Sequence, residues 1–232
     1  ISGRMDVIAG LEKAKPAMEY LRDAGVGCGV RITIGEFNLS QLASIIGAIE
    51  NTGLKRFAVC QHIEGSDWKA VKEERREIID SLIDYAMQNP EMEVVTEQLY
   101  DDGVYLLQRV AEHEPELAVE MEKLLARQGG CPAGDRIVNV DYRGNVHLCP
   151  YWQYRTIGNI REQKLSDICF DEENEILAMM KDKTQHLKGK CGRCRHNHLC
   201  RGCGARAEEM CGDLFGTDPA CYLTEKEVAA VR

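Results

Sequence analysis

The sequence has no long apolar run and no excess of basic residues. No stretch approaches the roughly 18 consecutive apolar residues that a membrane span requires, and the N-terminus shows no apolar signal segment. The formal net charge is −9, so nucleic acid is not an expected partner. We therefore expect a chain of one or two domains that binds neither membrane nor nucleic acid.

Cysteine is what the sequence has in quantity, with 11 in 232 residues. The stretch from Cys191 to Cys203 reads CGRCRHNHLCRGC, and Cys211 and Cys221 follow it. One CxxC turn lets two thiolates converge on a metal centre, and thiolate-rich sites select zinc or iron–sulfur clusters. The spacing therefore predicts metal binding.

Zinc and disulfides are the alternatives to iron–sulfur clusters. Zinc ribbons also use paired CxxC turns, and a secreted chain with this many cysteines would suggest a disulfide framework. The cysteines gather at one end of an otherwise ordinary α/β-like chain, which disfavours disulfides. We expect iron–sulfur clusters, and thiolates that stay reduced imply a cytoplasmic location.

The first half of the chain alternates helices with short β-branched strands, a pattern typical of parallel βα units. The predicted strands are 30–34, 55–62 and 93–96. The predicted helices are 6–23 with a kink or break at Pro16, a segment from Asn38 to Gly53, one from about Ser66 to Pro90, and 101–128 divided at Pro115. Because three parallel strands leave a bare edge, and because the chain starts at Ile1, we expect a piece of a longer fold.

Loops at the carboxyl ends of parallel strands usually carry the chemistry. Here these loops are 35–38 and 62–66, and they hold Asn38 and His62. Asn38 with Gln41 three residues later predicts a helix cap. A lone histidine such as His62 is more often structural than catalytic.

From Cys131 onward the elements become shorter. Residues 136–151 predict a β-hairpin that turns at Arg143-Gly144-Asn145. A second turn is expected at 156–159 and a helix at 165–180. We place a domain boundary near Gly129-Gly130.

The order of motifs over residues 131–223 resembles a known family. CPAGDRIVNVDYRGNVHLCP is followed by IGNI, by C-x2-C-x5-C-x2-C and by GDLFGTDPAC. This order is similar to the SPASM extension of radical S-adenosylmethionine (SAM) enzymes, which include peptide maturases and haem-biosynthesis enzymes. The resemblance implies an α/β fold: the second half of a partial (β/α) radical SAM barrel at 1–129, a SPASM domain with a hairpin and short helices at 130–224, and a tail at 225–232.

The resemblance also implies two auxiliary 4Fe-4S clusters. One would be held by Cys191, Cys194, Cys200 and Cys221, and the other by Cys131, Cys149 and Cys203. Many family members supply a fourth ligand just before the Cys131 position, where this chain reads LLARQGG. That cluster could instead have an open iron, bind substrate, use Cys211, or be smaller or missing.

The family's CxxxCxxC motif, which binds the SAM-cleaving cluster, does not occur in this sequence. Cys28, Cys60 and Cys169 stand alone, and we expect them to be apolar packing residues. The chain by itself is therefore not expected to cleave SAM, and we expect the motif in a missing N-terminal part. By resemblance Arg31 contacts the SAM carboxylate, whereas a structural ion pair is the plainer interpretation.

Basic and histidine side chains surround the cysteines. Nearby positive charge raises the reduction potential of a cluster, and the basic residues concerned are Lys188, Lys190, Arg193, Arg195, Arg201 and Arg206. His147, His196 and His198 are candidate hydrogen-bond donors near the clusters. Ordinary solvated surface groups are the alternative for both sets.

For the complete protein the resemblance implies an enzyme, a radical SAM oxidoreductase or maturase. It would abstract hydrogen from a peptide or a tetrapyrrole of the haem-pathway type, with ferredoxin or flavodoxin as electron donor. The auxiliary clusters would relay electrons or bind substrate. The alternatives are a non-enzymatic iron–sulfur adaptor for electron transfer and a structural module that holds zinc.

Overall fold

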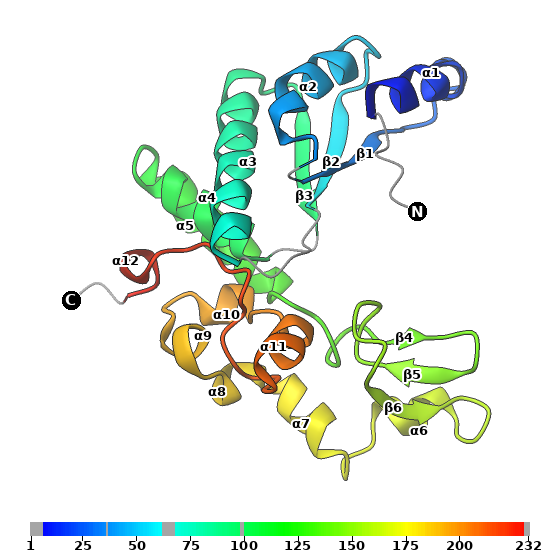
Figure 1. Ribbon diagram of the computed structural model, residues 1–232, viewed down its shortest axis with the longest axis vertical. Helices are drawn as coiled ribbons and strands as arrows, with labels where there is room; N and C mark the ends of the chain where they lie inside the picture. Colours follow the sequence, from blue (N-terminus) through cyan, green and yellow to red (C-terminus); the bar gives the residue numbers. More distant parts are fainter. Residues whose placement is uncertain (1–6, 36, 62–67, 98–99, 230–232) are drawn as a thin grey trace. The chain divides into compact units, whose positions relative to one another are not determined.

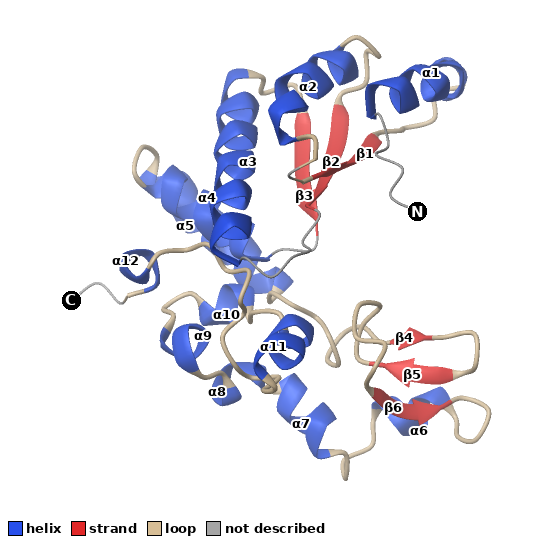
Figure 2. Ribbon diagram, in the orientation of Figure 1, coloured by secondary structure: helices blue, strands red, loops and turns tan. Residues whose placement is uncertain are grey.

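The computed structural model describes residues 7–35, 37–61, 68–97 and 100–229. They divide into two compact units, Ile1–Asp102 and Gly103–Arg232. Figures 1 and 2 show a parallel sheet with helices in the first unit, and short helices with a small antiparallel sheet in the second. The mixed α/β class expected from the sequence is thereby confirmed.

The N-terminal unit is built on three parallel strands in the order β1-β2-β3. They are β1 (Val30–Ile34), β2 (Arg56–Gln61) and β3 (Glu93–Glu97), and Val30 pairs with Phe57, which pairs with Val94. The connections are α1 (Val7–Asp23), the 3-10 turn η1 (Leu39–Gln41), α2 (Leu42–Glu50) and α3 (Trp68–Gln88). These elements follow the predicted ranges closely.

The two faces of this sheet differ in chemistry. Val30, Ile32 and Val59 point to a buried face, where Phe57 meets Tyr85 of α3 with ring centroids 5.9 Å apart. Fully burying a side chain of this size stabilises the fold by about 1.5–3 kcal/mol. Since side chains alternate along a strand, the opposite face presents polar groups, among them the Arg31–Glu97 ion pair.

A buried ion-pair network ties α3 to the start of α4 (Tyr100–Ala111). Arg75 Nη2 lies 3.1 Å from Oδ1 of both Asp101 and Asp102. The two carboxylates sit in the first turn of α4, where the helix dipole favours negative charge. The network therefore fixes where α4 begins.

Helix α1 continues across Pro16, because a proline removes one backbone hydrogen bond but does not have to end a helix. The break is therefore excluded, and the kink stays a prediction. The cap expected at Asn38 is wrong, because its side chain makes no capping hydrogen bond. Its amide accepts from Gly35 N–H and donates to Thr33 O, both at 3.0 Å, so it closes the turn after β1 instead.

The C-terminal unit combines a small antiparallel sheet with many short helices. The sheet has the order β4-β5-β6 and comprises β4 (Asn139–Val140), β5 (Asn145–His147) and β6 (Thr156–Asn159). The helices are α5 (Pro115–Gln128), α6 (Leu165–Cys169), α7 (Glu175–Lys181), α8 (Lys183–His186), α9 (Gly189–Arg193), α10 (Asn197–Cys200), α11 (Gly204–Cys211) and α12 (Glu225–Val228). Helix α5 packs against α10, and the boundary expected at Gly129-Gly130 stays a prediction.

The hairpin expected from the sequence is present, but two neighbouring predictions are wrong. Residues 156–159 are not a turn; they form β6, which pairs with β5 from Asn145 opposite Asn159. The helix expected at 165–180 is two helices, because Asn174 starts a new one by accepting from Leu177 N–H at 3.2 Å. Thr224 and Glu227 form a capping box that begins α12.

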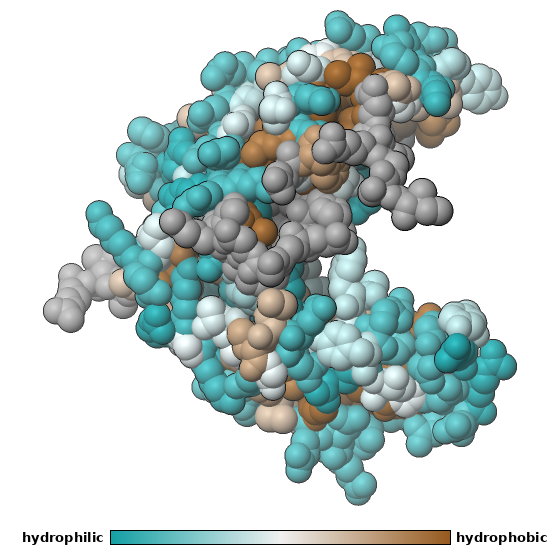
Figure 3. All heavy atoms as spheres, in the orientation of Figure 1, coloured by the Kyte–Doolittle hydropathy of each residue, from teal (hydrophilic) through white to brown (hydrophobic). Residues whose placement is uncertain are grey.

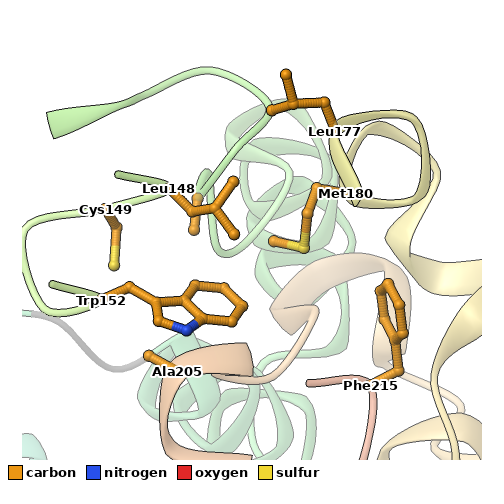
Figure 4. Close-up of a cluster of buried hydrophobic side chains, with 8 residues drawn as sticks. Leu148, Cys149, Trp152, Leu177, Met180, Ala205 and Phe215 are labelled. Atoms are coloured by element: carbon orange, nitrogen blue, oxygen red, sulfur yellow. The ribbon is translucent and has the colours of Figure 1, made fainter. Parts of the chain in front are cut away.

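The core of this unit is small and centres on a tryptophan (Figure 4). Trp152 is fully buried, and its indole Nε1 donates to Glu208 Oε2 at 2.7 Å. The same cluster contains Ala133, Leu148, Cys149, Leu177, Met180, Ala205 and Phe215. On the face drawn in Figure 3, most visible side chains of both units are hydrophilic. Within the residues that can be described, no helix has both the length and the apolar character to cross a membrane.

Candidate cluster-binding site

Cys131, Cys149 and Cys203 border the tryptophan core. Cys149 is part of that core, and the other two pack against it. Burial raises the pKa of the Cys149 thiol, and a negative charge on Cys131 adds to the effect. Burial likewise raises the pKa of Cys203 to about 11, again with a contribution from Cys131. Cys149 and Cys203 therefore each lie within electrostatic reach of Cys131.

Cys191 in α9 and Cys194 directly after that helix form a second neighbourhood. Cys194 N–H donates to Cys191 O at 3.4 Å, and burial raises the pKa of both thiols. Lys190 Nζ reaches the carbonyl of Cys221 at 3.2 Å, and Cys200 ends α10, which packs on α9. Because Cys131 N–H donates to Cys200 O at 3.0 Å, the two sets of cysteines are tied together.

The thiols are neighbours without touching a common point. Across the described ranges, no three side chains of His, Cys, Asp or Glu are placed to hold one metal ion. The assignment of the seven cysteines to two clusters therefore stays a prediction.

Peptide N–H groups point at the cysteine sulfurs. Asp218 N–H donates to Cys191 Sγ at 3.3 Å. Backbone N–H groups of His196 and Arg206 act in the same way on Cys194 and Cys203, where they offset part of the rise in pKa that burial causes. Hydrogen bonds to sulfur stabilise thiolates and tune the reduction potential of iron–sulfur clusters. The donor set, all sulfur and solvated by peptide N–H groups, fits iron–sulfur clusters.

Asp218 connects the two sets and was missed by the sequence interpretation. Its carboxylate accepts from Cys203 N–H at 3.0 Å and from Arg206 at 2.6 and 2.9 Å, while its own N–H binds Cys191 Sγ. The signal available in the sequence was its place in GTDPAC, three residues before Cys221. A buried carboxylate of this kind fixes the loop that carries the last cysteine.

Close backbone approach explains two glycines next to the cysteines. Gly130 has φ +61°, and a Cβ there would lie 2.5 Å from Cys200 O. Gly202 has φ +55°, and a Cβ there would lie 3.2 Å from Cys191 Sγ. Arg201, just before it, also has positive φ and is held by Asp135 at 2.7 Å. The two successive left-handed residues let the chain reverse between Cys200 and Cys203.

The basic residues of the cysteine-rich stretch fall into two groups. Lys188 and Arg193 form exposed ion pairs with Asp213 and Glu225, so they are ordinary surface groups. Arg206 is held inside by Asp218, and Lys190 points to backbone carbonyls near Cys221.

The three histidines have different environments. His147 is buried in the hairpin, with Nδ1 2.9 Å from Arg155 O and Nε2 3.3 Å from Asp141 Oδ2. His196 is buried too; desolvation, then the charges of Arg195 and His198, lower its pKa to about 4. Its Nε2 accepts from Arg195 Nε at 2.8 Å, and its backbone N–H donates a hydrogen bond to the thiol of Cys194. His198 is exposed.

The remaining candidate residues lie on elements other than those that carry the seven cysteines. Arg31 pairs with Glu97 on the polar face of the sheet, and Cys60 is buried beside them in β2. Cys28 precedes β1 and Cys169 ends α6, both half-buried. Cys211 is exposed at the far end of α11, about 12 Å along the helix from Cys203. His62 lies outside the described residues.

The spacing of the seven cysteines is typical of one class of domain. Residues 131–204 match the SPASM family model, an iron–sulfur cluster-binding domain. The resemblance to radical SAM enzymes with a C-terminal SPASM domain is thereby confirmed.

Three relatives extend this similarity over nearly the whole chain. Fe-coproporphyrin III synthase of Methanosarcina barkeri is 30% identical over 231 residues, which cover 94% of this chain and 58% of the relative. Pre-heme d1 synthase of Dinoroseobacter shibae is 30% identical, covering 95% and 58%. The crystal structure of Streptococcus suis SuiB bound to S-adenosylmethionine aligns with TM-score 0.61 at 17% identity, covering 91% of this chain and 49% of SuiB, which supports the fold alone. The chain thus spans 58% of the length of the two curated relatives and about half of SuiB.

Proposed function

We propose that this chain is the C-terminal part of a radical SAM enzyme that modifies a tetrapyrrole of the haem pathway. The observation that carries the proposal is the pair of cysteine neighbourhoods within a SPASM domain, each supplied with peptide N–H donors to sulfur. The names of the two 30% identical relatives favour a tetrapyrrole over a peptide. A peptide substrate is the second candidate, because a SuiB structure bound to its precursor peptide SuiA also aligns with this fold.

The N-terminal unit is proposed to be the second part of a partial (β/α) barrel. In such a barrel helices cover one face of the sheet and the other face lines the lumen. The sheet here is consistent with that arrangement, since its apolar face packs on α3 and its other face carries Arg31 and Glu97. Arg31 is then the candidate contact for the SAM carboxylate.

In the C-terminal unit, Cys191, Cys194, Cys200 and Cys221 are proposed to hold one auxiliary 4Fe-4S cluster. Cys131, Cys149 and Cys203 hold the second and leave one iron without a thiolate from this stretch. Cys211 is exposed, which supports a cluster in which Cys211 is not the fourth ligand and one iron stays open. The chain's own contribution is to bury the thiols, supply N–H donors to them and exclude water around Trp152.

SAM, cleaved at a cluster outside this chain, supplies the radical that abstracts hydrogen from the substrate. Ferredoxin or flavodoxin is the proposed electron donor, and the cytoplasm is the proposed location. No nucleic acid or membrane partner is proposed. A non-enzymatic electron-transfer module and a zinc-bound structural module are the alternatives that experiment must exclude.

The test uses the full-length protein purified without oxygen. Iron and sulfide counts distinguish clusters from zinc, and 5′-deoxyadenosine formation distinguishes an enzyme from an electron carrier. Iron-coproporphyrin is the product in the name of the first relative, so the probes are its haem-pathway tetrapyrrole precursors, tested one at a time. We expect one of them to stimulate 5′-deoxyadenosine formation and to be consumed, whereas a peptide leaves the basal rate unchanged. Cluster-loaded protein that forms no 5′-deoxyadenosine with either substrate contradicts the enzyme, and stimulation by peptide alone contradicts the tetrapyrrole.

Two variants test the residue assignments. Arg31→Met is expected to raise the KM for SAM at least tenfold, whereas Arg56→Met, which removes an exposed arginine paired to Glu93, leaves it unchanged. Cys211→Ser is expected to keep the full iron content, and loss of iron in this variant would make Cys211 the fourth ligand.

A further inference from the structure

Lys183 is a buried lysine at the start of α8 that the sequence interpretation did not single out. It is 1% exposed and ranks among the largest fully buried side chains of the described residues. Burying an ammonium group costs several kcal/mol unless an anion compensates it. The position therefore demands a negative partner.

The described side chains do not supply that partner. Lys183 Nζ donates to Gly202 O at 2.9 Å, a neutral acceptor. Throughout the described residues it forms no ion pair, and the nearby carboxylates of Asp135 and Asp218 are bound to Arg201 and Arg206. The charge of Lys183 is thus balanced by something other than an aspartate or glutamate.

Cysteines of both sets lie within the electrostatic reach of Lys183. Burial raises the pKa of Cys149 in the first set and of Cys191 in the second, and the positive charge of Lys183 offsets a small part of each rise. Its acceptor, Gly202, stands in the chain between Cys200 and Cys203 and packs against Cys191 Sγ. The ammonium group therefore lies beside the stretch from Cys200 to Cys203, where ligands of the two proposed clusters follow each other most closely in the sequence.

The other cations near the thiols are engaged differently. Arg206 shares its charge with Asp218. Lys190 is half-buried and reaches the carbonyls of Cys221 and Leu223, on the side of the second set alone. Among the described residues near the thiols, Lys183 is the buried cation that forms no ion pair with a carboxylate.

We propose that Lys183 is a counter-ion shared by the two cysteine sets, its ammonium group balancing the negative charge of the thiolate-bound clusters on either side. This inference rests on the proposed cluster binding. It makes Lys183 a positioning and charge-compensating residue, not a ligand. Since reduction adds an electron to each cluster, a fixed positive charge beside it favours the reduced state.

The experiment compares wild-type full-length protein with Lys183→Met, which keeps the length of the side chain and removes the charge. Iron and sulfide are counted first, and both auxiliary clusters are then titrated with reductant and followed by electron paramagnetic resonance. At the wild-type midpoint potential, we expect the reduced-to-oxidised ratio of each auxiliary cluster to fall about tenfold, a shift of about 59 mV to more negative potential. Lys181→Met removes an exposed lysine two positions away and should change neither potential.

Lys183→Arg keeps the inference testable if the methionine variant does not load iron. Retention of iron by arginine and loss by methionine supports a role for charge. Equal loss in both variants overturns the proposal, because the site would then require the shape of lysine and not its charge. Normal iron content with unchanged potentials, or a shift in only one cluster, also overturns it. A wild-type protein without iron overturns the cluster proposal as well, so the two failures are distinguishable.

Discussion

In the N-terminal unit, three strands and their helices bury a continuous apolar face that includes Ile34, Ile49 and Phe57. In the C-terminal unit, short helices of four to eight residues after the hairpin surround Trp152 and the cysteines. Apolar burial is non-directional and tolerates small shifts. The contacts around the thiols are directional hydrogen bonds between side chains and backbone, which hold only if every partner is in place. We infer that the first unit is stabilised mainly by its apolar core and the second mainly by the binding of metal to its cysteines.

The largest test of this difference is removal of the metal. Anaerobic chelation of iron from the full-length protein is expected to abolish amide protection from hydrogen exchange in residues 131–223. Strands β1–β3 should keep their protection, because their core contains no ligand. Structural metal sites contribute folding free energy of about 10 kcal/mol in small domains. Equal loss of protection in both units contradicts the comparison.

Gly130→Ala is expected to have the next largest effect. The added Cβ would lie 2.5 Å from Cys200 O, and the backbone has φ +61°, so both a clash and about 1–2 kcal/mol of left-handed strain oppose it. We expect at least half of the iron to be lost on purification. Gly212→Ala is the matched control, since it has φ +70° but open space around it; equal iron loss there would assign the effect to strain alone.

Phe57→Ala tests the first unit. Phe57 is fully buried in β2 and touches Tyr85, so its truncation is expected to lower the free energy of unfolding by about 3–5 kcal/mol. Urea unfolding followed by exchange in β1–β3 measures the loss, and the iron content should stay that of the wild type. Tyr20→Ala, at a side chain that is 75% exposed, serves as the control.

Glu208→Gln tests the polar contacts of the second unit. The carboxylate of Glu208 accepts from Trp152 Nε1 and pairs with Arg155, and the hydrogen bond from Arg155 lowers its pKa. Removing the charge is expected to destabilise this unit by about 1–3 kcal/mol, measured by hydrogen exchange of residues 131–223. Glu209→Gln changes an exposed neighbour, and an equal effect of that variant would argue against the specific contact.

Asn38→Asp is expected to have the smallest effect and distinguishes two roles. A helix cap accepts aspartate as readily as asparagine, whereas the observed turn needs the amide to donate to Thr33 O. Loss of that hydrogen bond is expected to cost about 1 kcal/mol in thermal unfolding of the first unit. Unchanged stability would restore the capping interpretation.

The elements of the N-terminal unit were readable from the sequence because each follows a local period. Val30, Ile32 and Ile34 alternate along β1, and Ile45 and Ile49 recur at helical spacing in α2. The C-terminal unit offered fewer such signals. Strand β6 contains a glycine that packs closely on Ile168, and it is a strand only because β5 pairs with it.

The residues of the site also divide into those that the sequence reveals and those that only the fold reveals. The cysteines and their spacing, and with them the SPASM family, follow from the sequence alone, because metal ligation demands particular residues at particular intervals. The roles of Asp218 and Lys183 do not, since a single aspartate or lysine has no local period and gains its meaning from burial and from neighbours far away in the chain. The sequence by itself determined the chemistry of the ligands and the α/β class. Tertiary structure alone decided which charged groups lie beside the thiols, because burial and distance exist only once the chain is folded.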